Sequence, residues 1–303
     1  MKELYPMRGV ITTVNTPFNA DLTINWSDLR RTAEAALEAG VSGFLAPCFA
    51  SEIDELTNEE RYRMVTELLA VTHQVGHGIV MPNVRGKTKD DCVEQAKRYL
   101  NLGVDGVNIF MPTVTEESYR ELVAAVDELH PPFLCLQDTK DNELRAPFVK
   151  SMFDEFESFR CIKIETANPG PDYTAILKAT DGRLNVSGSW GSDQMIEAFD
   201  RGIHALMPSG LFELFVNVYR LYHEKSREAA MKLFFDILPI IVFTRQSDSA
   251  NLSLHKRYFQ RLGLYTTTKF RAPFAVDAVQ AHYIEEMIDR ALYIRDHMDQ
   301  YWQ

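Results

Sequence analysis

The sequence has 303 residues, of which 46% are hydrophobic and 25% are charged, and its formal net charge is -11. This composition is ordinary for a folded globular protein and excludes a fibrous or largely disordered chain. The negative charge disfavours nucleic acid and anionic membrane surfaces as partners, because both are polyanions that need a basic face. At this length we expect one large domain with an extension.

The cysteines and the N-terminus indicate where the protein works. Cys48, Cys92, Cys135 and Cys161 are scattered and form no CxxC pair, which is typical of reduced thiols inside a cell. The first ten residues lack the apolar segment of a signal peptide, and no run approaches the length of a membrane span. We therefore expect a cytoplasmic protein.

Strand-like and helical segments alternate along the first two thirds of the chain. The strand-like runs are 10–14, 43–46, 78–82, 107–111, 133–137, 161–164, 184–187 and 204–207, and the helical segments between them are 26–39, 58–72, 89–102, 116–129, 147–155, 172–179 and 192–200. Three of the helices stop at a glycine suited to a left-handed C-terminal position, namely Gly40, Gly103 and Gly202.

Short runs that are apolar on both faces and alternate with helices are typical of parallel strands covered on both sides. Eight such units predict an α/β fold, a (β/α)8 TIM barrel. The structural alternative is an open, doubly wound sheet, but no GxGxxG follows the first strand to support a dinucleotide-binding version.

From about Phe212 onward the pattern is helical, over 214–224, 227–243, 255–262 and 276–298. This is more than one closing helix. We expect a catalytic barrel over residues 1–225 and a C-terminal helical extension over 226–303 packed on it.

Lys163 is the only lysine within any of the eight strand-like runs, and it lies between Ile162 and Ile164. Burying an ammonium without a partner is costly, so such a lysine pairs with a carboxylate or loses its proton. A desolvated free amine is a nucleophile toward a carbonyl. The alternative is a structural salt bridge from Lys163 to Glu52 or Asp138.

Five phrases along the chain resemble one known family. GVITTVNTPF (9–18), SEIDELTNEER (51–61), IKIET (162–166), VSGSW (186–190) and KFRAPF (269–274) are similar to the dihydrodipicolinate synthase and N-acetylneuraminate lyase family in order and spacing. The resemblance implies a (β/α)8 barrel with a helical extension, usually a homotetramer. It also implies that Lys163 forms a covalent imine with pyruvate or another 2-oxo acid, with no other cofactor.

The sequence also departs from the family pattern. Residues 48–52 (CFASE) stand where most members have Gly-Thr-Thr-Gly-Glu, and Gln137-Asp138 replaces a Tyr-Asn pair whose tyrosine carries protons. An amide does not titrate near neutral pH, so Gln137 cannot act as that acid. An arginine and two aromatic residues of the lysine-pathway enzyme are also replaced, by Asn142, Thr113 and Val114. These departures disfavour dihydrodipicolinate synthesis, which stays the alternative. They look more like the branch that contains 2-keto-3-deoxy sugar acid dehydratases.

The candidate site residues follow from strand ends and from the resemblance. The catalytic candidates are Lys163, Glu165, Gln137, Asp138 and Ser51, and the substrate-binding candidates are Phe49, Ala50, Glu52, Thr13, Gly188, Ser189 and Trp190. Glu165 lies two residues beyond Lys163, so strand alternation directs both side chains to one face. With Asp138, Glu52 or a water, it is a candidate for the base that replaces the tyrosine. The alternative for Glu165 is a charge partner that keeps Lys163 protonated. A carboxylate whose pKa is raised by burial could shuttle protons near neutrality, and Ser51 could relay them.

The resemblance implies that main-chain N–H groups of residues 49–51 bind the substrate carboxylate. It also implies that Gly188 lets the backbone approach the substrate and that Ser189 and Trp190 line the distal pocket. Two other hypotheses stay open. Glu52, Asp138 and Glu165 could hold Mg²⁺ or Mn²⁺, although Lys163 would repel the cation and we expect no metal. The second open hypothesis is a barrel that binds a 2-oxo acid without catalysing a reaction.

Overall fold

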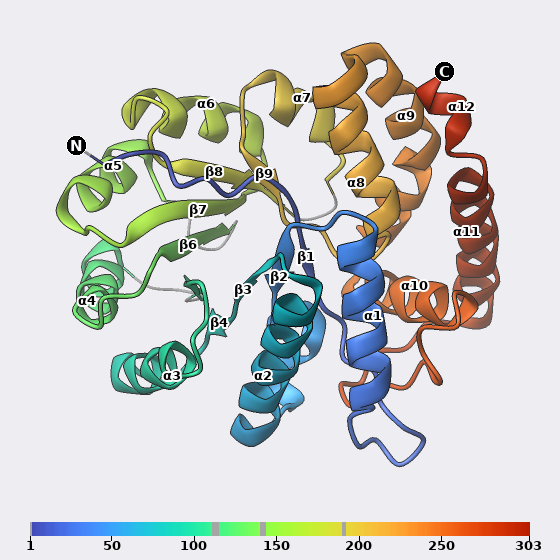
Figure 1. The fold of residues 1–303 in the computed structure, drawn as a ribbon, viewed down its shortest axis with the longest axis horizontal. Coiled ribbons are helices and arrows are strands. Elements are labelled where there is room, and N and C mark those ends of the chain that lie inside the picture. Colours follow the sequence, from blue (N-terminus) through green and yellow to red (C-terminus); the bar gives the residue numbers. More distant parts are fainter. Residues whose placement is uncertain (1, 111–114, 140–143, 190–191) are drawn as a thin grey trace.

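The computed structural model describes residues 2–110, 115–139, 144–189 and 192–303. Parallel strands form a curved central sheet, helices cover its outside, and the C-terminal helices lie on one flank (Figure 1). The strands are β1 (Gly9–Thr13), β2 (Gly43–Leu45), β3 (Ile79–Met81), β4 (Asn83–Val84), β5 (Val107–Ile109), β6 (Leu134–Thr139), β7 (Phe159–Glu165), β8 (Asn185–Gly188) and β9 (Ala205–Leu206).

The sheet wraps into a nearly closed barrel, which confirms the predicted fold. Its strand order is β3-β2-β1-β9-β8-β7-β6-β5-β4, and every pair is parallel. β3 and β4 are two halves of the predicted third strand, separated by Pro82, which has no N–H for a ladder bond. One half pairs with β2 and the other with β5, so the eight predicted strands appear as nine segments.

Helices follow the strands as predicted. They are α1 (Trp26–Glu38), α2 (Asn58–Val75), α3 (Lys89–Asn101), α4 (Glu116–Asp127), α5 (Ala146–Glu155), α6 (Pro169–Ala179), α7 (Met195–Asp200) and α8 (Phe212–Arg220). The glycines predicted to end helices adopt positive φ angles of 100° at Gly40, 84° at Gly103 and 88° at Gly202. These left-handed residues turn the chain from each helix toward the next strand.

Four further helices form the C-terminal flank: α9 (Arg227–Thr244), α10 (Asp248–Arg261), α11 (Ala278–Asp296) and α12 (Asp299–Trp302). α9 packs on α7 and α8, and α10 and α11 pack on α9. α10 begins seven residues earlier than the predicted start at His255, because the Ser247 side chain accepts a hydrogen bond from the Ala250 N–H and caps a polar first turn. The division at residues 225 and 226 stays a prediction.

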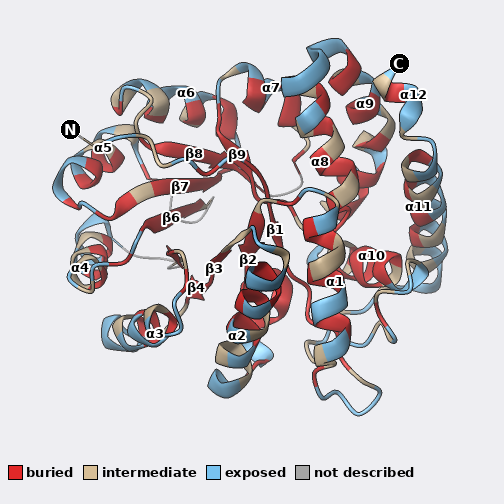
Figure 2. Cartoon of the chain, viewed as in Figure 1, coloured by how far each residue is buried: buried red, intermediate tan, exposed pale blue. Residues whose placement is uncertain are grey.

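The strands are buried, whereas the outer faces of the helices are exposed (Figure 2). Apolar side chains form a separate cluster on each side of the barrel wall. Side chains that point outward from the strands pack under the helices, as Ile162 and Ile164 of β7 do. Side chains that point inward fill the barrel, among them Cys135 of β6 and Cys161 of β7. Alternation along each strand therefore decides which polar residues face the interior.

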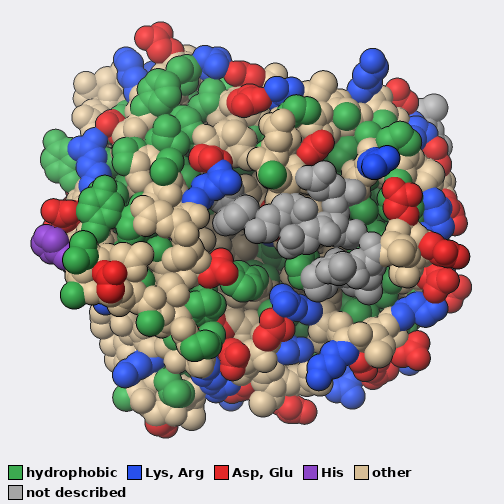
Figure 3. Space-filling model, turned by 180° about the vertical axis from the view of Figure 1, so that it is seen from behind, with side chains coloured by type: hydrophobic (Ala, Val, Ile, Leu, Met, Phe, Trp, Pro, Cys, Tyr) green, Lys and Arg blue, Asp and Glu red, His purple; other side chains and the backbone are tan. Residues whose placement is uncertain are grey.

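The surface mixes acidic and basic side chains, and apolar side chains gather on the flank of the C-terminal helices (Figure 3). Exposed apolar residues there include Phe235 and Val242 of α9 and Val279 and Tyr283 of α11. Among the described helices, none has the length and apolar character to cross a membrane.

Candidate active site

Lys163 lies inside the barrel on β7, with 4% of its surface exposed. Its neighbours Ile162 and Ile164 point outward into the helix layer, so alternation sends Lys163 and Glu165 inward together. The Lys163 Nζ is 3.1 Å from Glu165 Oε1. The predicted shared face is therefore present, and Glu165 is the carboxylate that pairs with the lysine, in place of Glu52 or Asp138.

Glu165 is held by neighbours on both sides. Ser189 Oγ lies 2.6 Å from Glu165 Oε1, and the Gln137 amide nitrogen donates to Glu165 Oε2. Burial raises the pKa of Glu165, but the Lys163 charge and the hydrogen bonds from Ser189, Lys163 and Gln137 outweigh it, and the pKa is lowered overall. The expectation of a raised pKa is thus wrong for Glu165 while Lys163 lies beside it. At neutral pH its carboxylate is ionised and accepts hydrogen bonds.

A ladder of side-chain amides extends from Glu165 across three neighbouring strands. Asn108 of β5 donates from Nδ2 to Gln137 Oε1 of β6 at 2.7 Å and to Asn83 Oδ1 of β4 at 3.0 Å. An ionised carboxylate only accepts, so Gln137 must turn its amide nitrogen toward Glu165 and its oxygen toward Asn108. Gln137 is thereby a positioning residue for Glu165.

Lys163 lines a cavity of about 390 Å³ at the C-terminal ends of the strands. Its wall includes Thr13, Phe49, Ala50, Gln137, Glu165 and Ser189 of the predicted set, together with Asn83, Phe110, Leu211, Phe215, Asn251 and His255. Arg85 stands at the wall and pairs with Asp54 at 2.8 Å. The α10 residues show that the C-terminal flank closes one side of the site.

The loop after β2 has two backbone amides available for a ligand. Phe49, Ala50 and Ser51 form one 3-10 turn, in which the Ser51 N–H donates to the Cys48 carbonyl at 2.9 Å. The amides of Phe49 and Ala50 have no bond to a carbonyl among the described residues, and both residues line the cavity. The Ala50 amide interacts with the Cys48 thiol, which is a weak acceptor. The predicted amide set is therefore reduced to these two.

Ser51 is not placed for a proton relay. Its hydroxyl bonds to the Val14 carbonyl at 2.5 Å and accepts from the Cys48 N–H at 3.1 Å. The side chain is fully buried and does not line the cavity. Its role in this geometry is to hold the loop after β2 against β1.

Glu52 is also directed away from the cavity. Its carboxylate pairs with Lys256 of α10 at 2.6 Å, with both side chains fully buried, and accepts from the N–H groups of Arg271 and Ala272 at 2.9 Å each. Burial lowers the pKa of Lys256 to about 8 against the pull of Glu52. Glu52 thus joins the loop after β2 to the segment 269–274, and it is not a substrate contact in this structure.

Two further candidates fall on outward positions of their strands. Asp138 follows the inward Gln137, so it points toward the helix layer, where its carboxylate accepts from the Leu144 N–H at 2.7 Å. Gly188 precedes the inward Ser189, and a Cβ added there would lie 2.8 Å from the Tyr173 hydroxyl. Gly188 is therefore explained by packing against α6, and not by an approach of substrate.

The remaining sequence expectations divide in two. Trp190, Thr113, Val114 and Asn142 lie outside the described residues. The three carboxylates of the metal hypothesis are engaged separately, with Lys256, with the Leu144 amide and with Lys163. Within the described ranges, no three His, Cys, Asp or Glu side chains come together as metal ligands do.

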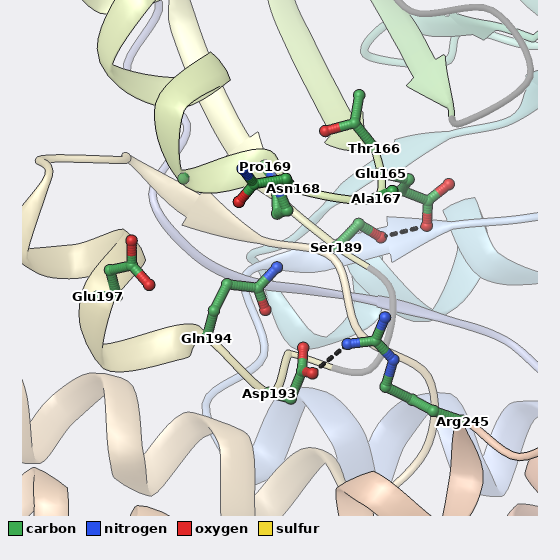
Figure 4. A pocket seen from close by; sticks show the side chains of 11 residues that line it. Glu165, Thr166, Ala167, Asn168, Pro169, Ser189, Asp193, Gln194, Glu197 and Arg245 are labelled. Atoms are coloured by element: carbon green, nitrogen blue, oxygen red, sulfur yellow. Dashed lines mark hydrogen bonds and ion pairs between the residues drawn. The ribbon is translucent and has the colours of Figure 1, made fainter.

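A second cavity of about 160 Å³ lies on the other side of Glu165 and Ser189, which line both. Its wall comes from the loop before α6 and from the region of α7, and it includes Asp193 paired with Arg245. Figure 4 shows Ser189 turned toward Glu165 and Arg245 turned toward Asp193. Glu165 and Ser189 thus border both the larger cavity beside Lys163 and a small polar one.

Sequence reasoning missed Asn108, Asn251 and His255. It considered groups at strand ends, whereas Asn108 lies in the middle of β5, and its signal was a polar residue between the apolar Val107 and Ile109. The two α10 residues carried no signal, because only the folded chain brings that helix to the barrel mouth.

Comparisons with known proteins give one consistent result. The model of the dihydrodipicolinate synthetase family matches residues 6–129. An "uncharacterized DapA-like lyase" of Halobacterium salinarum is 27% identical over 237 residues, which cover 74% of this chain and 75% of the relative. The 4-hydroxy-tetrahydrodipicolinate synthase of Salinibacter ruber is 28% identical over 122 residues, 40% of each chain.

Solved structures agree in fold. Dihydrodipicolinate synthase from Rhodopseudomonas palustris superimposes with a TM-score of 0.87 at 19% identity, covering 96% of this chain and all of the other. A prophage protein of the dihydrodipicolinic acid synthase family from E. coli K12, solved in complex with pyruvate, gives 0.84 at 16% identity, with 94% and 98% covered. These likenesses confirm the barrel with its C-terminal helices.

Proposed function

We propose that the chain belongs to the dihydrodipicolinate synthetase family, whose model matches residues 6–129, and that it is a Schiff-base-forming lyase that dehydrates or cleaves a 2-keto-3-deoxy sugar acid. The observation that carries the proposal is the buried Lys163 amine, 3.1 Å from Glu165, facing a cavity of about 390 Å³. At roughly 30 Å³ per water-sized group, the cavity holds on the order of a dozen such groups, about twice what pyruvate supplies.

The first step forms the imine. Lys163 gives a proton to Glu165, and the resulting neutral amine adds to the C2 ketone. The hydroxyl of this adduct takes the proton back from Glu165 and leaves as water as the C=N bond forms, which gives an iminium that withdraws electrons from C3. In this proposal the main-chain N–H groups of Phe49 and Ala50, two residues that line the cavity, bind the substrate carboxylate. At the end of this step Glu165 is ionised again beside the iminium nitrogen.

In dehydration, Glu165 takes a proton from C3 and the C–H electrons form the enamine. The enamine then expels the β-hydroxyl, which leaves as water with the proton that Glu165 returns. In aldol cleavage, Glu165 takes the proton of the C4 hydroxyl, the C3–C4 bond breaks, and an aldehyde leaves the enamine on Lys163. Either route uses one carboxylate and needs no tyrosine.

The test is reduction of the imine by borohydride in the presence of pyruvate, followed by intact mass and peptide mapping. We expect one adduct, on Lys163, and none in Lys163→Ala. Lys256→Met is the matched control, because Lys256 is the other deeply buried lysine of the described chain and pairs with Glu52; it should still form the adduct. No adduct on the native protein would refute the proposal and favour a non-catalytic binding barrel.

Turnover of a panel of 2-keto-3-deoxy acids, with products identified by NMR, separates dehydration from cleavage. If the native protein condenses pyruvate with an aldehyde and turns over no member of the panel, the dihydrodipicolinate synthase-like alternative holds. The assay is repeated with a chelator, and unchanged turnover supports imine chemistry without a metal. The homotetramer and the cytoplasmic location stay predictions, which sedimentation and fractionation would check.

A further inference from the structure

One face of α10 lines the cavity opposite the strands. Asp248, Asn251, Leu252 and His255 all lie in the cavity wall. Their spacing of three, four and seven residues puts them on one side of the helix. The helix thus offers the cavity three polar side chains and one leucine.

Two of these side chains carry buried polar atoms that bond to nothing in the described chain. They are the Asn251 Oδ1 and the His255 Nδ1. His255 is 97% buried, with 3% of its surface exposed. Buried polar atoms in native structures are almost always satisfied, and an unpaired one destabilises the fold. These two unpaired atoms, on residues that line the cavity, therefore call for a polar partner that the described chain does not supply.

The ring of His255 is held in place by the loop after β9. Gly210 has a φ of 57°, and a Cβ added there would lie 2.2 Å from the ring. Only glycine lets the loop pack so closely on the imidazole. Thr13 and Ser209, whose hydroxyls are 2.6 Å apart, continue the polar wall beside it.

The chemistry of the two atoms selects the ligand. The Asn251 oxygen accepts and therefore needs a donor. Burial lowers the pKa of His255 to about 3, so the imidazole is neutral and has one donor and one acceptor nitrogen. A hydroxyl both donates and accepts, whereas a second carboxylate would leave the Asn251 oxygen unpaired and would face Asp248 on the same helix face.

We propose that Asn251 and His255 of α10 form a subsite for the neutral hydroxyl groups on the distal carbons of the substrate. This inference rests on the proposed function, which makes the 2-oxo acid end of the substrate the reacting end. It adds that the rest of the substrate is a chain with several hydroxyl groups. The C-terminal helices thereby select the substrate, while the strands hold the lysine.

The experiment measures binding without imine chemistry. The probe is a 3-deoxyaldonic acid, in which an alcohol replaces the ketone, and its affinity is measured by calorimetry. We expect Asn251→Leu to weaken binding on the order of tenfold, the effect of one lost hydrogen bond. Trapping of pyruvate on Lys163 is measured on the native protein alongside, so that imine chemistry and binding of the tail are reported separately.

Asn217→Leu is the matched control. Asn217 is a partly buried asparagine of α8 that donates to the Glu213 carbonyl and accepts from Trp302, outside the cavity. Replacing Asn217 removes more hydrogen bonds within the protein than replacing Asn251 does. The Asn217→Leu protein should nevertheless bind the probe with the affinity of the native protein. Asn251→Ser is the second variant if the leucine prevents folding.

The outcomes are separable. If the native protein does not bind the probe, or if Asn251→Leu and Asn251→Ser bind it as tightly as the native protein, the subsite is refuted. If the native protein binds the probe but forms no pyruvate adduct, the subsite stands and the imine proposal fails.

Discussion

Replacing Asn108 by leucine removes the amide that orients Gln137 and keeps a side chain of similar length inside the barrel. Asn108 is fully buried and donates to Gln137 at 2.7 Å and to Asn83 at 3.0 Å. Without it, the Gln137 oxygen has no donor and nothing fixes which end of the amide meets Glu165. The charge-assisted bond from Gln137 to Glu165, worth about 1.5–3 kcal/mol, is then lost for part of the time.

Two consequences follow for the proposed reaction. The rate of imine trapping with pyruvate should fall by about 10- to 100-fold, which is the same energy expressed in the barrier. The acid side of the pH profile should also move. Gln137 is one of the groups that lower the pKa of Glu165, so losing its bond raises that pKa, and the ionised form disappears at a higher pH as acid is added.

Other charged or titratable groups near Glu165 should keep their places in the variant. Lys163 lies on its own strand, Cys135 lies on β6, Tyr173 reaches it from α6, and Asp193 lines the neighbouring cavity. Only the hydrogen bond from Gln137 is changed. A shift of the acid limb of the pH profile would therefore show that the side-chain amide ladder affects Glu165.

The assay is the rate of trapping with pyruvate by cyanoborohydride, which survives acid, between about pH 3 and 9, so that the window includes pH values below the usual pKa of a glutamate. Asn185→Leu is the matched control: Asn185 is also fully buried, on β8, and donates two bonds, to the carbonyls of Tyr5 and Met7 at 3.0 and 2.7 Å. It should lose similar stability and keep the native pH profile. A native profile and rate in Asn108→Leu would refute the positioning role.

Two further predictions concern stability. Glu52→Gln leaves the buried Lys256 ammonium without its counter-charge and should lower the free energy of unfolding, measured in urea, by about 3–5 kcal/mol. The double variant Glu52→Leu with Lys256→Met should recover part of that loss. A Glu52→Gln protein within about 1 kcal/mol of the native stability would contradict the buried pair. Gly188→Ala places a methyl group 2.8 Å from the Tyr173 hydroxyl and should lower the free energy of unfolding by about 1–3 kcal/mol. Because that methyl group points away from the cavity, an altered KM in a folded Gly188→Ala variant would show that the glycine faces the substrate after all.

The barrel and the lysine were predictable from sequence because both depend on local patterns. Runs apolar on both faces gave the strands, glycines gave the helix ends, and the alternation of Ile162, Lys163 and Ile164 placed the amine inside. The same alternation could have corrected two errors. Gln137 and Asp138 are adjacent on one strand and cannot both face inward, and Gly188 and Ser189 cannot either.

The other errors needed distant partners. Glu52 was indistinguishable from a cavity carboxylate until Lys256, 204 residues later in the chain, was brought against it. The likeness of the phrases 51–61 and 269–274 to the family also has a structural reason, because Glu52 accepts from the Arg271 N–H and the Arg271 side chain pairs with Glu60 at 2.7 Å. Residues that share a motif with the site can thus serve the fold alone.

The pairing of Glu165 with Lys163 also explains how one carboxylate can replace a tyrosine in the proposed mechanism. While the nitrogen is a cationic iminium, the charge 3.1 Å away keeps Glu165 ionised and able to accept a proton. When C3 loses its proton the nitrogen becomes neutral, the electrostatic support for the carboxylate ends, and the proton affinity of Glu165 rises. The proton transfer from C3 to Glu165 therefore removes the iminium charge and the carboxylate charge in the same step. The buried site then holds no unpaired ion at the enamine stage.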